Sequence, residues 1–132
     1  MIKIKYKLKP SKTHGIGLFA DEDIEMNQVV FESSKQFMSA WTIKKFAKLD
    51  SRIKKYIKHY GSFSKVDNLW HLNHGDIRFC NHSVQKNNIS RKDLSGKNYQ
   101  LVAMRCIKKG EELLQDYNEF DSTIKERVGI KN

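Results

Sequence analysis

Residues 2–8 alternate strictly between apolar and lysine side chains. This period of two predicts a half-exposed β-strand, and the lysines are typical of a strand at the edge of a sheet. The β-branched and aromatic residues of segments 28–33 and 98–107 predict two further strands. Short strands are therefore expected towards both ends of the chain.

The middle of the chain has a different pattern. Between residues 43 and 60, apolar side chains recur at steps of three and four, which is the spacing of an amphipathic helix. Asp50 and Ser51 are typical of a helix start, so we expect a second short helix there. The opposite face carries seven cations: Lys44, Lys45, Lys48, Arg52, Lys54, Lys55 and Lys58. The pattern predicts a mainly β fold with a short, basic helical insert at about residues 42–60.

Two stretches resemble each other and predict tight turns. Residues 24–29 and 107–112 each begin with isoleucine and place Asn27 or Gly110 at the fourth position. Asn and Gly tolerate positive φ angles, so each stretch is expected to turn sharply into a strand.

Composition limits the class of protein. The 132 residues, 39% of them apolar, suffice for one domain with one core, which we expect to span residues 1–132. No apolar run approaches the roughly 20 residues of a membrane-spanning helix, and the N-terminus lacks the apolar block of a signal peptide. Two cysteines are too few for a disulfide framework. The sequence predicts a soluble intracellular domain without membrane contact.

Charge is distributed unevenly along the chain. Lys and Arg number 25 against 15 Asp and Glu, which gives a net charge of +10. Between residues 111 and 126, however, six of the seven charged side chains are acidic. This local reversal is suited to binding a cationic ligand on an otherwise basic protein.

Three segments carry side chains suited to chemistry. Residues 14–20 contain two glycines, which let the main chain approach a ligand closely or simply form a turn. Residues 78–83 include consecutive Asn, His and Ser, which either orient a polar ligand or form a polar turn satisfied by its own bonds. Tyr117 is either a core tyrosine or a hydroxyl placed to stabilise a cationic centre.

A zinc site is a further possibility. Its ligands would come from this set of thiol and imidazole side chains: His71, His74, Cys80, His82 and Cys106. Structural zinc sites usually contain closely spaced ligand pairs such as C-x2-C, and the sequence has none. We therefore expect no metal, and interpret the set as surface histidines with a buried thiol.

Together, the motifs resemble those of the SET-domain protein-lysine methyltransferases. They are Gly15-Ile16-Gly17-Leu18-Phe19-Ala20, Asn81-His82-Ser83 with Asn87, and Glu112-Leu113 with Asp116-Tyr117. Their order and spacing match the family over about residues 3–120, and the length is similar to that of minimal viral and bacterial members. The resemblance implies a SET-domain (β-clip) fold of several small sheets with a pseudoknot-like C-terminal segment, followed by a tail at residues 121–132.

The chain departs from the family pattern at three points. Lys86 stands where the family commonly has proline before Asn87. Gln115 occupies a position that is often aromatic or apolar and that borders the lysine pocket in many members. No cysteine follows Tyr117, so the cysteine-rich zinc module of the histone-type enzymes is absent, and we expect residues 118–132 to close the site without a metal.

The resemblance also implies a cofactor, S-adenosylmethionine, and roles for individual residues. The cofactor-binding residues would be Gly15, Ile16, Gly17, Asn81, His82, Tyr117 and Phe120. The glycine segment would lie at the methionine end and Phe120 over the adenine. Tyr117 would be the catalytic residue, and the walls of the channel that admits lysine would be Tyr60, Phe79 and Tyr117.

The implied reaction is methyl transfer to lysine in a basic protein, with histones and ribosomal proteins as candidate substrates. The amine must be neutral, and because free lysine titrates near 10.4, roughly one side chain in a thousand is neutral at pH 7. A sulfonium and an apolar channel both disfavour the ammonium form, so no dedicated general base is required.

The sequence also supports other interpretations. The cations of residues 44–58, with Tyr56 and Tyr60 nearby, are suited to contacting nucleic acid, or they form an ordinary solvated helix face. The chain is alternatively a SET-fold protein without activity, although it retains the motif residues. A homodimer is a further expectation, because a second copy would complete a site that lacks a C-terminal module.

Overall fold

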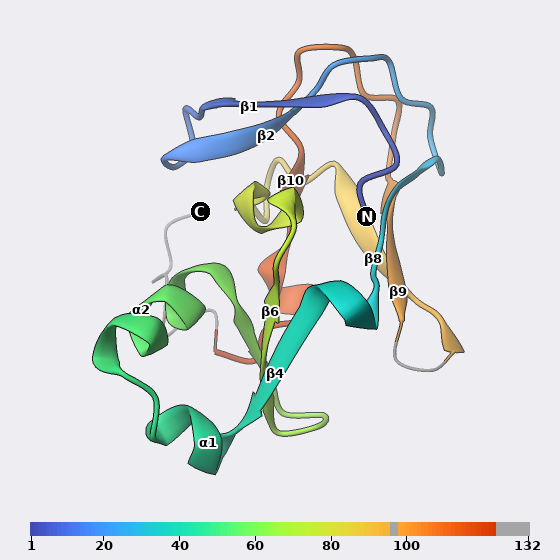
Figure 1. Cartoon of the computed structure of the whole chain (residues 1–132). Coiled ribbons are helices and arrows are strands. Elements are labelled where there is room, and N and C mark those ends of the chain that lie inside the picture. Colours follow the sequence, from blue (N-terminus) through green and yellow to red (C-terminus); the bar gives the residue numbers. More distant parts are fainter. Residues whose placement is uncertain (96–97, 124–132) are drawn as a thin grey trace.

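Short strands dominate the fold, as the alternating segments predict (Figure 1). The computed structural model describes residues 1–95 and 98–123. Its strands are β1 (Tyr6–Pro10), β2 (Ile16–Ala20), β3 (Val29–Glu32), β4 (Met38–Thr42), β5 (Ser62–Ser64), β6 (Leu69–Asn73), β7 (Asn81–His82), β8 (Ile89–Asp93), β9 (Tyr99–Ala103) and β10 (Leu114–Gln115). Its helices are α1 (Ile43–Ala47) and α2 (Ser51–Tyr60), with 3-10 turns η1 (Lys35–Phe37), η2 (Asp76–Phe79) and η4 (Tyr117–Glu119).

The described strands form four small sheets. Their orders are β1–β2, β10–β7, β3–β9–β8 and β4–β6–β5. The β7–β10 pair is parallel and the other pairs are antiparallel. The β1–β2 hairpin lies at one end of the molecule, and α1 lies at the other, beside β4 and β6 (Figure 1). The arrangement confirms the mainly β fold of several small sheets with one helical insert.

The first strand begins later than the alternation predicts. The backbone N–H of Lys3 donates to the Val30 carbonyl (2.8 Å), so this part of the chain pairs beside β3. From Tyr6 onwards the chain pairs with β2 instead. The change of partner divides the segment that the sequence pattern joins, and Leu8 ends up 39% exposed.

The two predicted turns are confirmed, and they pair with each other. Asn27 has φ 70° and Gly110 has φ 94°, the conformation for which these residue types are suited. Ile24 and Ile107, which begin the two stretches, form an antiparallel bridge. Both isoleucines are buried. The sequence similarity of the two stretches therefore corresponds to one junction in space.

The helical insert has a small core of its own. Thr42 caps α1 and Asp50 caps α2, the second confirming the predicted helix start. Phe46 and Ile57 are buried with Leu72 of β6. This second core holds the insert against the β4–β6–β5 sheet. No helix in the described part of the chain is long and apolar enough to cross a membrane.

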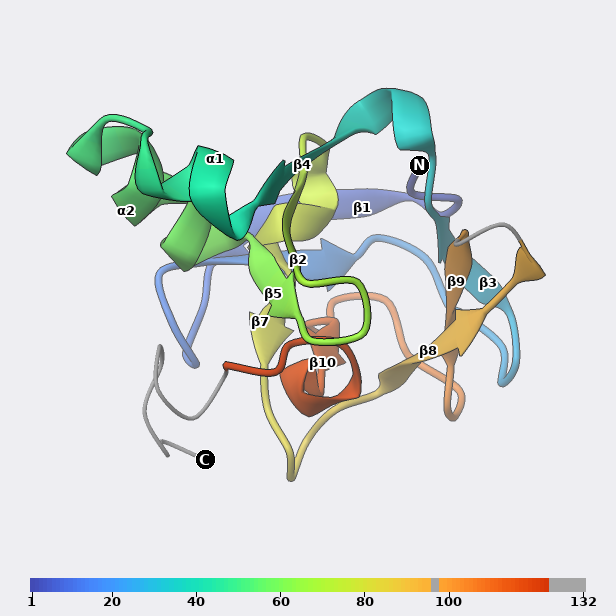
Figure 2. The same ribbon diagram turned by 90° about the horizontal axis from the view of Figure 1, so that it is seen from below.

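The C-terminal segment passes between two sheets that are distant in sequence. On one side, the N–H of Leu113 donates to the Leu18 carbonyl of β2 (2.8 Å). On the other, β10 pairs with β7. The chain then reaches β5, where the N–H of Ser122 donates to the Phe63 carbonyl (2.8 Å). Figure 2 shows β10 enclosed by β7, β8 and β5, which matches the expected pseudoknot-like segment.

Asn88 fastens the same segment. Its carboxamide donates to the Glu112 carbonyl (2.8 Å) and accepts from the Leu114 N–H (2.9 Å), and the residue is 1% exposed. The neighbouring Asn87, which belongs to the sequence motif, makes a different contact: its amide reaches the Met104 sulfur at 3.5 Å, in an exposed contact.

Replacing Asn88 by leucine should destabilise the protein by about 3 kcal/mol, because it leaves a buried carbonyl and a buried N–H unpaired. The free energy of unfolding in urea measures the loss. Asn87→Leu is the matched control, with an expected change below about 0.5 kcal/mol. Equal losses in the two variants would show that Asn88 has no special part in holding the segment.

Candidate functional site

Tyr117 is held at both of its ends by the segment around β7. Its backbone N–H donates to Nδ1 of His82 (2.9 Å), and its hydroxyl donates to the Cys80 carbonyl. A backbone N–H can only donate, so the neutral His82 ring carries its proton on Nε2. The hydroxyl proton of Tyr117 is thus directed at a backbone carbonyl.

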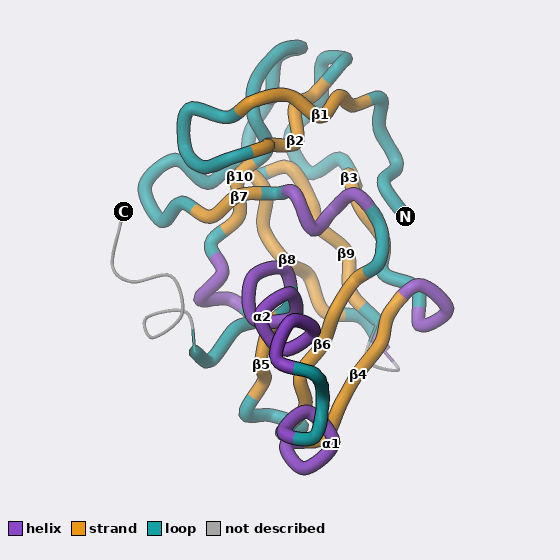
Figure 3. The backbone as a smooth tube through the Cα atoms, turned by 60° about the vertical axis from the view of Figure 1, so that its left-hand side comes forward, coloured by secondary structure: helices purple, strands orange, loops and turns teal. Residues whose placement is uncertain are grey.

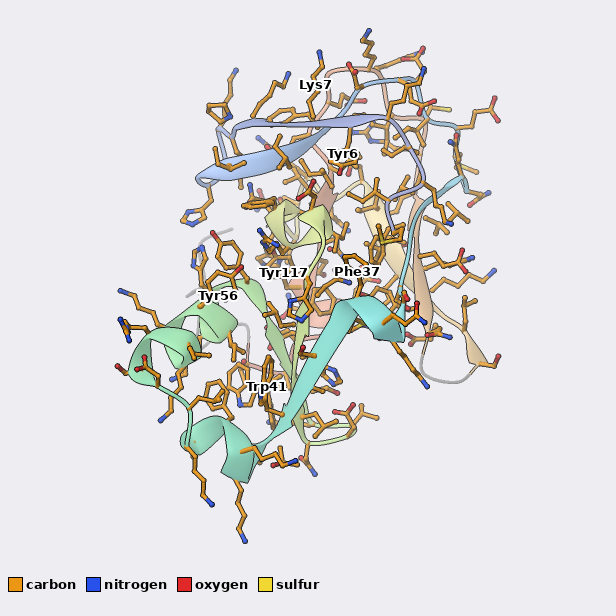
Figure 4. The ribbon with its side chains drawn as sticks, in the orientation of Figure 1. Tyr6, Lys7, Phe37, Trp41, Tyr56 and Tyr117 are labelled. Atoms are coloured by element: carbon orange, nitrogen blue, oxygen red, sulfur yellow. The ribbon has the colours of Figure 1, made fainter. Side chains whose placement is uncertain are left out.

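Tyr117 lines a cleft of about 560 Å³, a volume within the range of small-molecule sites. Tyr60 and Phe120 also line it. Figure 4 shows Tyr117 near the centre of the molecule. Of the residues expected at the site, these three are brought together at the cleft.

The aromatic residues around the cleft lie ring against ring. The centroids of Tyr60 and Phe79 are 5.8 Å apart in an edge-to-face arrangement, and those of Tyr117 and Phe120 are 5.4 Å apart. The His82 ring lies 4.9 Å from Tyr117. Such surfaces favour apolar groups and cations.

Arg78 is a residue that the sequence analysis did not single out. Its guanidinium lies 4.8 Å from the centroid of Phe79 and 5.8 Å from that of Tyr60, and it lines the cleft. One of its terminal nitrogens donates to the His74 carbonyl (2.9 Å). Its Nε is buried without a hydrogen-bond partner in the described part of the chain. A fixed positive charge therefore lies beside the rings of Tyr60 and Phe79.

Gln115 also faces the cleft. The residue is 5% exposed and lines the cleft. Its carboxamide can both donate and accept hydrogen bonds, so it is suited to contacting a polar ligand there. The sequence identified this position as a departure from the family, without indicating what the side chain does.

The position of the glycine segment, residues 14–17, is fixed by hydrogen bonds from Asn81. The Asn81 amide donates to the carbonyls of His14 (2.9 Å) and Ile16 (3.2 Å) and to Oε1 of Glu112 (2.9 Å). Gly15 has φ 47° and open space where a Cβ would lie. The predicted residues Gly15, Ile16, Gly17, Phe79, Asn81 and His82 are not among those that line the cleft.

Glu112 explains why residue 17 is glycine. A Cβ on Gly17 would lie 2.2 Å from Oε1 of Glu112, far inside van der Waals contact. The same oxygen accepts from the Ser11 hydroxyl (2.6 Å) and from Asn81. The carboxylate thus joins β2, β7 and the C-terminal segment. Glu112 belongs to one of the sequence motifs, but the sequence did not predict that it would accept hydrogen bonds from Ser11 and Asn81.

The histidines and cysteines do not form a metal centre. No group of three or more potential ligands is arranged to hold a metal ion within residues 1–95 and 98–123. His71 pairs with Asp67 (2.8 Å). The Cys80 thiol donates to the Leu113 carbonyl (3.3 Å), and burial raises the pKa of this thiol well above its usual range. Cys80 is therefore a structural, unreactive thiol.

The acidic groups of the cleft wall are mostly paired. Asp93 pairs with Arg91 (2.8 Å) and Asp67 with His71. Glu119 accepts from the backbone N–H of Arg91 (3.2 Å), and burial raises the pKa of its carboxyl.

The contact between Glu112 and Gly17 predicts strong coupling between them. Gly17→Ala alone should cost more than about 2 kcal/mol, because the new methyl group meets a carboxylate already held by two donors. In a Glu112→Ala background the same change should cost less than about 1 kcal/mol. Urea unfolding of the wild type, the two single variants and the double variant measures this. Additive losses would mean that Glu112 does not require glycine at this position.

The chain resembles known proteins in sequence. A family model of the SET domain matches residues 15–118. The relatives include two proteins named histone-lysine N-methyltransferase, H3 lysine-36 specific. The Chaetomium globosum protein is 34% identical over 110 residues, 79% of this chain and 12% of the relative. The Debaryomyces hansenii protein is 32% identical over 108 residues, 79% of this chain and 15% of the relative. The chain thus spans a small part of their length.

The fold is shared with solved structures. Polycomb Repressive Complex 2 of Chaetomium thermophilum, autoinhibited and bound to S-adenosylmethionine, has a TM-score of 0.68 at 24% identity, covering 95% of this chain and 16% of that chain. The apo complex with substitutions in Ezh2 has a TM-score of 0.70 at 24% identity, covering 94% of this chain and 16% of that chain. At this level of identity the likeness shows a common fold.

Proposed function

The chain belongs to the SET-domain family, and on that basis we propose that it transfers a methyl group from S-adenosylmethionine to the side-chain amine of lysine in a basic protein. One observation carries the proposal beyond family membership. Tyr117, the tyrosine of the C-terminal motif, lines the cleft with its hydroxyl proton directed at the Cys80 carbonyl. In this proposal, the Tyr117 hydroxyl contacts the substrate amine in the cleft.

The residues around the cleft fit the cofactor. The cleft volume suits a molecule of this size, and the rings of Tyr117 and Phe120 suit a cationic sulfur and an adenine. Gly15, with open space around its Cα, exposes main-chain groups to a polar ligand. In this proposal, Asn81 and His82 contribute to the cofactor site through the main chain of β7. Asn81 also contributes by holding the loop that contains Gly15. When bound, S-adenosylmethionine supplies the methyl group from a positively charged sulfonium.

The protein's own part is to orient a neutral amine. Tyr60 lines the cleft with its ring packed edge-to-face on Phe79, and the nearby Arg78 charge disfavours the ammonium form of lysine. The Tyr117 oxygen accepts an N–H of the amine, which aligns the nitrogen lone pair for reaction. The Gln115 carboxamide lies in the same cleft and is a second group able to hold the amine.

The proposed substrate is a lysine-rich basic protein, with histones first. Support comes from the names of the two fungal relatives, which specify histone H3. The acidic residues between 111 and 121 add long-range attraction for a basic segment. A ribosomal protein has the same charge and is the second candidate.

Tyr117→Phe should lower the rate of methyl transfer by about 10²–10³-fold, because it removes the oxygen that orients the amine while keeping the ring. Transfer of a labelled methyl group to a histone mixture measures the rate, and calorimetry measures cofactor affinity, which should change less than about threefold.

Tyr6→Phe is the matched control. It also removes a tyrosine hydroxyl, one that donates to Asp76 (2.7 Å) and does not line the cleft. Its activity at 25 °C should stay within about twofold of wild type. Unimpaired transfer by Tyr117→Phe would contradict the role given to this residue. Absence of transfer by the wild type to any basic protein, despite cofactor binding, would favour an inactive SET-fold protein.

A further inference from the structure

The helical insert has a concentrated positive charge that the structure does not neutralise. Residues 43–60 contain seven cations and one acid, Asp50. That acid caps α2 and pairs with Arg52 (3.2 Å). The six lysines of the insert form no ion pair within residues 1–95 and 98–123. All of them are exposed except Lys54, which is half-buried.

The spacing of the lysines works against helix stability. Lys54 and Lys58 are four residues apart on α2, and Lys55 and Lys58 are three apart. Like charges at these spacings repel each other across one helical turn. An insert selected only for folding would place acids between them. The retained repulsion suggests that an external anion neutralises this face.

The apolar side of the insert is partly covered, because Phe46 and Ile57 are buried with Leu72 of β6, while Ile43 and Ile53 remain 54% and 48% exposed. Beside the lysines, α2 also exposes the ring of Tyr56, which is 43% exposed and lies 4.8 Å from the Tyr60 ring. Cations beside an exposed aromatic ring are the combination with which proteins contact phosphates and bases.

We propose that this surface, residues 44–58 of α1 and α2, binds the phosphate backbone of nucleic acid. The basis is charge complementarity between a regular polyanion and lysines that form no ion pair with residues 1–95 or 98–123. Helix α1 lies at the end opposite the β1–β2 hairpin (Figure 3), and α2 runs from there to His59, whose ring lies 5.9 Å from that of His14 in the loop that joins β1 and β2. The exposed lysines of the insert are accessible to an extended ligand.

The position of the surface links it to the cleft. His59 and Tyr60, at the end of α2, line the cleft, and Lys58 immediately precedes them. Nucleic acid on the insert would thus lie about one helical turn from the cleft mouth. A basic protein that is already bound to nucleic acid would be held with its lysines close to Tyr117. This consequence rests on the proposed function, whereas the binding itself does not.

The test compares two triple variants that lose the same charge. One is Lys54→Gln, Lys55→Gln and Lys58→Gln on α2, and the control is Lys3→Gln, Lys5→Gln and Lys7→Gln near the N-terminus. Lys7 points away from the body beside β1 (Figure 4). Fluorescence anisotropy with a labelled 20-base-pair DNA, between about 50 and 200 mM salt, gives the affinity and its salt dependence. Equal melting temperatures establish that both variants are folded.

The α2 variant should bind at least about tenfold more weakly at 50 mM salt, and the slope of log K against log salt should fall by about three. The control should lose less than about one unit of slope. Equal losses in both variants, or no binding of DNA by the wild type, would overturn the proposal. So would an α2 variant that loses binding to anionic vesicles but keeps DNA. The assay contains no S-adenosylmethionine and no lysine substrate, so its failure leaves the proposed function untouched.

Discussion

The structure depends on the passage of residues 111–117 between β2 and β7. Hydrogen bonds fix this segment on both sides, from Leu113 to Leu18 of β2 and through the parallel β7–β10 pair. Asn88 adds two bonds from a fully buried position. Buried backbone groups must be paired, so the segment has one register in which all these bonds are made.

That register also determines where the candidate functional residues lie. Because β10 pairs with β7, Tyr117 follows the strand at the level of His82 and Cys80, and both of its bonds go there. The same segment brings Glu112 to Gly17 and Asn81, which sets the course of the glycine loop. The fold therefore couples motifs that lie about a hundred residues apart.

The helical insert is organised independently. Its small core of Phe46, Ile57 and Leu72 is separate from the main core, and its caps are local. This separation allows its outer surface to carry unbalanced charge without disturbing the packing around Tyr117. The two regions meet at Tyr60, which packs against the second core and lines the cleft.

Local features of the fold were predictable from the sequence, and long-range ones were not. The helix start at Asp50 and the turns at Asn27 and Gly110 follow from residue type and neighbours, so the pattern predicted them. The late start of β1 depends on a change of strand partner, which no local pattern contains.

The same distinction applies to the candidate site. A motif identified Tyr117 and the family resemblance implied Tyr60, and the structure brings the two together at the cleft. The motif contained Asn87 and gave no indication of the buried Asn88 beside it, because burial depends on the course of the whole turn. The position of the Arg78 guanidinium over the Phe79 ring is likewise a tertiary contact, which the spacing of residues in the sequence does not reveal.

The most direct measurement is a crystal structure with S-adenosylhomocysteine and a lysine-containing histone peptide. The lysine nitrogen should lie in the cleft beside the Tyr60 ring, within hydrogen-bond distance of the Tyr117 hydroxyl, while that hydroxyl still donates to the Cys80 carbonyl. A lysine bound away from Tyr117, or a homocysteine moiety remote from Gly15, would contradict the assignment of this cleft as the methyl-transfer site.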